Sequence, residues 1–145
     1  MLLWTGSVLA PFPSGAALGD DHGSVEADRR VLQASLRVSE NASYRMSELQ
    51  TELGVTVRQY ETVAGTVFAV TWHGPFKPDL RQLLGSHFES YGSAPRAPAA
   101  LRGRAARIVV PGGVVVQSEG HSRSFSGYAY LPALMPAGMS VDDLR

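Results

Sequence analysis

The sequence has no cysteine, no excess of either charge and no long apolar run, and each absence excludes a class of protein. Without cysteine the chain has no disulfide, no thiolate metal site and no cysteine nucleophile. A membrane-spanning helix needs roughly 18 or more consecutive apolar residues, and no such stretch occurs. Thirteen basic and thirteen acidic residues cancel. This balance argues against a nucleic-acid-binding protein, because such domains are usually strongly basic.

The catalytic and cofactor motifs that can be read from sequence are missing as well. The chain carries no G-x-S-x-G nucleophile elbow, no glycine-rich phosphate loop ending in lysine and no H-E-x-x-H zinc motif. Its four histidines are far apart in the sequence, so no metal site is predicted. The sequence names no cofactor, and we favour a domain that binds over one that catalyses.

What remains is a chain of 145 residues in which 44% are hydrophobic and 18% are charged. This length and composition predict one folded domain with a hydrophobic core. Within residues 1–16, the stretch at 2–10 is mainly apolar. Pro11 and Pro13 follow it, and the range ends in small residues. That order is typical of a secretory signal with its cleavage site. The basic residues that normally begin a signal are missing, which a translation start placed a few residues too late would explain. We therefore expect a mature domain of residues 17–145 in the periplasm or outside the cell.

The pattern of the mature chain predicts an α+β fold. We expect an antiparallel sheet of about five to six strands, formed by hairpins, with two helices packed on one face. The first helix is predicted at 24–38, with Leu32 and Leu36 in its apolar stripe, and the second follows Pro78. The strands are predicted at 44–53 (where a helix is the alternative), 55–62, 66–73, 107–110, 114–119 and 122–131.

Two predictions concern single elements. Leu80, Leu83, Leu84, His87, Phe88 and Tyr91 have helical spacing, so we expect His87 to be buried with the leucines. In the strand at 66–73, alternation predicts Phe68, Val70 and Trp72 on one face and Val67, Ala69 and Thr71 on the other.

Residues 92–107 contain four arginines and no acidic residue. Their alanine and proline content predicts a flexible loop. Such a basic loop suits contact with an anionic surface, or with another exported protein for which this chain would be a structural partner. A solvated loop from an arginine-favouring genome is the simpler interpretation.

One group of residues is the candidate partner or ligand surface. Trp72 and His73 end the most apolar strand, and a predicted hairpin tip and the strand after it carry the remaining members, which are His121, Arg123, Tyr128 and Tyr130. Brought together, these aromatic and cationic side chains suit an anionic or peptide ligand. The alternative functions are a small periplasmic hydrolase with His121 or His73 as its base, and the structural partner described above.

The runs 65–75, 78–85 and 120–132, together with the ending at 142–145, resemble an uncharacterised family of exported bacterial proteins known as domain of unknown function 2844. Residues 16–19 also resemble the usual signal-cleavage junction of that family. The resemblance covers nearly all of the mature chain and implies an exported protein. It implies no activity, cofactor or catalytic residue.

Overall fold

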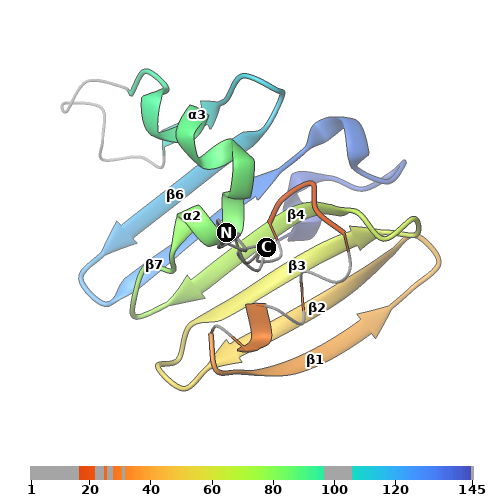
Figure 1. Ribbon diagram of the computed structural model, residues 1–145, viewed down its shortest axis with the longest axis horizontal. Coiled ribbons are helices and arrows are strands. Elements are labelled where there is room, and N and C mark those ends of the chain that lie inside the picture. The colour runs from red at the N-terminus through yellow and green to blue at the C-terminus, as the bar shows by residue number, and fades with distance from the viewer. Residues whose placement is uncertain (1–16, 22–24, 26–27, 31, 97–105, 145) are drawn as a thin grey trace, which may run out of the picture.

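The structure, a computed structural model, is built around a seven-stranded antiparallel sheet with the strand order β1-β2-β3-β4-β7-β6-β5 (Figure 1). It describes residues 17–21, 25, 28–30, 32–96 and 106–144. The strands are β1 (Ala34–Glu40), β2 (Tyr44–Thr51), β3 (Thr56–Thr62), β4 (Val67–Gly74), β5 (Ala106–Val109), β6 (Val115–His121) and β7 (Ser124–Tyr130). The predicted signal at 1–16 and most of the predicted loop at 92–107 lie outside the described residues.

Short turns join the strands within each half of the sheet. Gly54, Gly65 and Gly112 have positive φ angles, which glycine adopts without strain, and they lie in the links β2–β3, β3–β4 and β5–β6. The long connection from β4 to β5 contains the helical segment and reaches the far edge of the sheet (Figure 1). Strand β7 then returns beside β4, so β4 and β7 become the centre of the sheet.

The prediction of a helix at 24–38 is wrong in its C-terminal part, from Leu32 onward. Val25 and the residues at 28–30 are helical, but Ala34–Glu40 forms β1 and pairs with β2 along its whole length. Gln33, with a φ of 48°, interrupts the helical path. Leu36 has helical spacing with Leu32 and strand alternation with Val38, and pairing with β2 decides between the two. Over the residues that the structure describes, the fold is therefore mainly β, with seven strands instead of five to six. Apart from the helical residues at 25 and 28–30, those residues contain one longer helical segment where two helices were predicted.

The helical segment runs from α2 (Leu80–Leu84) through the 3₁₀ turn η1 (Gly85–His87) to α3 (Phe88–Ser93). Asp79 caps it by accepting a hydrogen bond from the Arg81 backbone, at 2.9 Å. The predicted apolar stripe is buried at Leu80, Leu83, Leu84 and Tyr91.

His87 is only half-buried, so its prediction as a core residue is wrong. The reason is Gly85, which has a φ of 51° and turns the chain before His87. A Cβ at Gly85 would lie 2.2 Å from Cβ of Ala17, so the turn also lets the N-terminal residues approach the helix closely. His87 lies instead beside Gly19 and Gly112.

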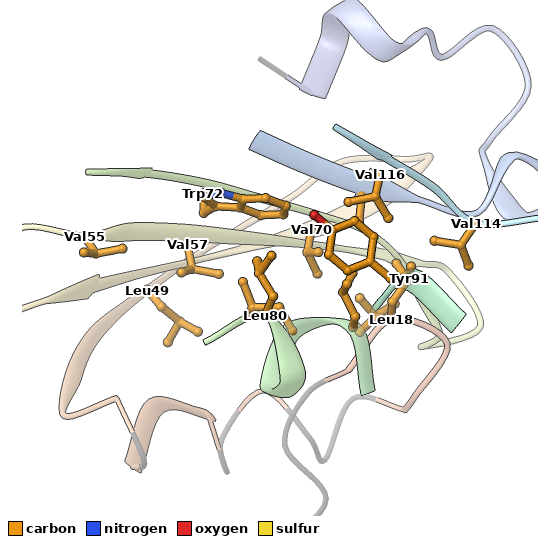
Figure 2. Close-up of a cluster of buried hydrophobic side chains, with 14 of the residues drawn as sticks. Leu18, Leu49, Val55, Val57, Val70, Trp72, Leu80, Tyr91, Val114 and Val116 are labelled. Atoms are coloured by element: carbon orange, nitrogen blue, oxygen red, sulfur yellow. The ribbon is translucent and has the colours of Figure 1, made fainter. Parts of the chain in front are cut away.

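Each face of the sheet carries its own hydrophobic cluster. On one face, Leu49, Val57, Val70, Trp72 and Val116 pack against α2 and α3 (Figure 2). The segment after β7, with the 3₁₀ turns η3 (Pro132–Leu134) and η4 (Val141–Leu144), covers part of the other face. That second cluster consists of Tyr60, Phe68, Ala69, Val115, Tyr128, Tyr130 and Leu144.

Because β4 contains a bulge, the predicted assignment of its side chains to the two faces of the sheet is wrong at Val67 and Phe68. Tyr60 pairs with Ala69 and Glu61 pairs with Val67, so Phe68 has no partner on β3. The extra residue reverses the alternation. Val67 therefore joins Val70 and Trp72 on the helix-covered face, whereas Phe68 is buried on the opposite face.

Candidate functional site

A groove of about 470 Å³ lies on the face opposite the helical segment. The segment after β7 covers the part of this face around Tyr60, Phe68 and Tyr130 and leaves the part beside it open. Leu144, almost fully buried, stands at the boundary and lines the groove. A cavity of this size is in the range of small-ligand sites.

Strand register builds the groove from two rows of side chains. In one row Thr56, His73, Ser126 and Glu119 pair in succession across β3, β4, β7 and β6. The next row on the same face consists of Arg58, Thr71, Tyr128 and Gln117. All of these residues line the groove, together with Trp72, Gly127 and Leu144. Most lining residues therefore carry a hydrogen-bond donor or acceptor, although much of the surface that they present to the groove is apolar.

On the β6–β7 side, a chain of hydrogen bonds fixes the lining. The Tyr128 hydroxyl donates to Oε1 of Gln117 at 2.6 Å. Gln117 in turn donates from Nε2 to Oε1 of Glu119 at 3.0 Å. Because the Gln117 amide uses both of its ends, its orientation is set, and the Glu119 carboxylate is held at the rim.

On the β3 side, Arg58 is held by an ion pair. Its Nε donates to Oε2 of Glu48 at 2.8 Å, and 40% of the Arg58 side chain stays exposed. The hydrogen bond to Glu48 raises the pKa of the Arg58 guanidinium. Beneath it, burial raises the pKa of the Tyr60 hydroxyl. Arg58 is therefore a cation at the groove wall at neutral pH.

The structure brings the two halves of the candidate surface together, because β4 pairs with β7. His73 and Tyr128 line the groove. Trp72 also lines it, but its side chain is buried in the cluster on the other face. Tyr130 is buried under the C-terminal segment, where Nη2 of Arg107 donates to its hydroxyl at 3.0 Å.

The two remaining members of the candidate surface lie at the β6–β7 hairpin tip. His121 pairs with Ser124, one step beyond the groove residues Glu119 and Ser126 on the same face. Arg123 lies in the turn with a φ of 63°, a conformation that favours glycine. Both residues are exposed at the open end of the groove.

Several groove residues were missed at the sequence level, namely Thr56, Arg58, Thr71, Gln117, Glu119 and Ser126. Within β3 and within β6, strand alternation separates the residues of one face from those of the other. It therefore puts Arg58 and Glu119 on the more polar face of each strand. It does not tell which strands are neighbours. The adjacency of β4 and β7 was the missing information, since this pairing joins the two halves of the groove.

Among the described residues, no group of histidine and acidic side chains is arranged to hold a metal ion. None of the helices in that part of the chain has the length and apolarity required to cross a membrane. The model of the family described as "Protein of unknown function (DUF2844)" matches residues 14–144. Searches of curated proteins and of solved structures found no significant match.

Proposed function

The chain belongs to the DUF2844 family, and we propose that it is an exported, periplasmic binding domain that holds a polar ligand in the sheet groove without chemical conversion. The observation that supports this proposal is the groove itself. Polar side chains from four adjacent strands line it, and hydrogen bonds and an ion pair fix its two sides. Side chains held in place before binding lose little conformational entropy when a ligand arrives.

A hydrolase is the second candidate, and one arrangement favours it. His73 and Ser126 are paired neighbours on β4 and β7 and both line the groove. Serine acts as a nucleophile when a histidine takes its proton and a third group orients the histidine. The acid in this row, Glu119, lies beyond Ser126 and is bonded to Gln117, so it is not placed to orient His73. We therefore rank binding above hydrolysis.

Filling the groove tests the proposal. Ser126→Phe places a ring on the groove floor, and Ser39→Phe makes the same change at an exposed position on β1. Fractionated extract of the native cell envelope is added to isotope-labelled protein, and backbone amide shifts are recorded by NMR. We expect one fraction to shift amides of β4 and β7 in the wild type and in Ser39→Phe, and not in Ser126→Phe.

If no fraction perturbs the groove, or if Ser126→Phe responds like the wild type, the proposal fails. Hydrolysis is tested separately with aryl ester and aryl amide substrates. A turnover that His73→Gln abolishes would establish the hydrolase in place of the binding domain.

A further inference from the structure

We infer that the groove takes a short zwitterionic peptide, with the ligand's ammonium group at Glu119 and its carboxylate at Arg58. This inference rests on the proposed binding function and deepens it. Arg58 on β3 and Glu119 on β6 line opposite sides of the groove, with β4 and β7 between them. A ligand that satisfies both residues must carry opposite charges at its two ends.

The distance between these strands sets the length of the ligand. Neighbouring strands are about 4.8 Å apart, so the β3 and β6 backbones are separated by roughly 14 Å. An extended peptide covers about 3.3–3.6 Å per residue, so three residues cover roughly 10 Å. Hydrogen bonds from the two charged ends of the peptide, roughly 3 Å each, account for the remaining distance. A tripeptide is therefore the natural length for a groove of about 470 Å³.

The cationic side has the geometry for a carboxylate. Arg58 gives its Nε–H to Glu48, and this bond fixes the plane of the guanidinium. The guanidinium also interacts with the Tyr60 hydroxyl, and its remaining N–H donors lie at the groove wall. Arginine binds carboxylates through pairs of parallel N–H donors, which distinguishes it from lysine.

The anionic side has the geometry for an ammonium group. Oε1 of Glu119 accepts the hydrogen bond from Gln117, and the hydroxyl of Tyr128 holds Gln117 from behind. The carboxylate therefore presents its second oxygen, Oε2, without needing to reorient. An ammonium group supplies three donors and forms charge-assisted bonds with such an acceptor.

The floor between the two charges suits a peptide backbone. Thr71, His73 and Ser126 lie there, and hydroxyl and imidazole groups both donate and accept hydrogen bonds. Peptide units also present one donor and one acceptor each. A neutral sugar would leave both charged ends unused, and a polyanion would meet the carboxylate of Glu119 with charge of its own sign.

Binding of trialanine to the full chain tests this inference. Trialanine, its N-acetyl form, its C-terminal amide and the doubly blocked form are titrated into isotope-labelled protein, and groove amides are followed by NMR. We expect blocking either end to weaken binding roughly tenfold, the loss expected for one charge-assisted hydrogen bond.

Two variants assign each end of the peptide. In Glu119→Gln, acetylation should no longer weaken binding, whereas amidation should still do so. In Arg58→Gln the reverse should hold. Glu89→Gln and Arg81→Gln, which change the same residue types on the helical segment, are the controls and should behave like the wild type.

The outcomes separate this inference from the proposed function. If groove amides respond equally to trialanine and to its doubly blocked form, or to a neutral disaccharide in place of the peptide, the zwitterionic ligand is wrong and the binding function stands. If neither the peptides, the disaccharide nor any envelope fraction perturbs the groove, both are wrong.

Discussion

The indole ring of Trp72 lies across Gly127, the residue that pairs with it on β7 (Trp72 is labelled in Figure 2). A Cβ at Gly127 would be 2.3 Å from Cζ2 of Trp72 and 2.5 Å from the backbone oxygen of Gln117. No side chain can occupy this position while the ring stays in place. The backbone of Gly127 therefore lies between the hydrophobic core on one face of the sheet and the groove floor on the other.

Gly127→Ala should destabilise the protein by roughly 1–3 kcal/mol, the usual cost of overpacking. Both the Trp72 ring and the Gln117 backbone would have to shift. Urea denaturation measures the change in the free energy of unfolding. Gly92→Ala is the matched control, because a Cβ there meets nothing within 4 Å and the position is helical. The control should be neutral or slightly stabilising. Equal stability of the two variants would contradict the packing described here.

Leu84→Ala should destabilise the protein by roughly 2–5 kcal/mol. Leu84 is fully buried between α2 and the sheet, so its truncation loses burial and leaves a cavity. Val63→Ala is the control, since Val63 is 80% exposed, and it should change stability by less than about 0.5 kcal/mol. A melting temperature for Leu84→Ala within about one degree of the wild type would mean that the stripe does not face the core.

Replacing Arg123 by glycine or by alanine should change the stability of the protein differently. Arg123→Gly should stabilise the protein by about 1 kcal/mol, because glycine adopts a φ of 63° without the steric cost of a Cβ. Arg123→Ala keeps that cost and should leave stability within about 0.5 kcal/mol.

If the hairpin tip also contacts an acidic ligand, both Arg123 variants should weaken binding by roughly 1.5–3 kcal/mol. Thermal unfolding and binding measured on the same samples separate the two effects. Lost stability with unchanged binding in Arg123→Ala would make Arg123 a structural residue.

The last turn, η4, should loosen in acid. Asp143 accepts hydrogen bonds from the backbone and the hydroxyl of Ser140, and the backbone bond is the main reason that the pKa of Asp143 is lowered. A lowered pKa means that the stabilisation is present above the ordinary aspartate pKa of 3.8 and is lost as the pH falls through the lowered value.

Methyl shifts of Leu144 between pH 6 and pH 2 measure this effect, because η4 ends at that residue. Asp143→Asn should loosen the turn at neutral pH. Asp142→Asn keeps the Ser140–Asp143 bonds and serves as the control. Leu144 shifts that follow neither pH nor the Asp143 substitution would show that the cap does not hold the turn.

The proposed export predicts the residue at which the mature protein begins. Protein isolated from the native periplasm should begin at Ala17, where the predicted leader ends. N-terminal sequencing that found Met1 would contradict export by cleavage. Leu18 and Gly19 donate backbone hydrogen bonds to Leu83 and Val67, so these residues are part of the folded domain.

Local patterns predicted most elements of this fold and little of its groove. Turn glycines and apolar alternation placed β3, β4, β6 and β7 close to their observed bounds, and helical spacing identified the stripe at Leu80, Leu83 and Leu84. The failures have physical causes. Leu36 fits a helix with Leu32 and a strand with Val38, so the choice between helix and strand fell to the pairing of β1 with β2. A bulge at Phe68 cannot be read from alternation.

The groove depends on long-range register, which a single sequence does not contain. His73 and Tyr128 were identified because His73 ends the most apolar strand and Tyr128 lies on the strand after the predicted hairpin tip. Arg58 and Glu119 were missed because nothing in their local sequence shows that β7 lies between β4 and β6.

The strand order has a consequence for how the chain assembles. Strands β1 to β4 form a meander of neighbouring hairpins, so they can pair as soon as they are made. The outer edge of β4, which is among the most apolar strands, then stays unpaired until β7 arrives from near the end of the chain. Pairing β4 with β7 costs more chain entropy than forming any hairpin of the sheet, so we expect it to be a slow step of folding. Until the two strands pair, the partly folded protein exposes an apolar strand edge to other chains.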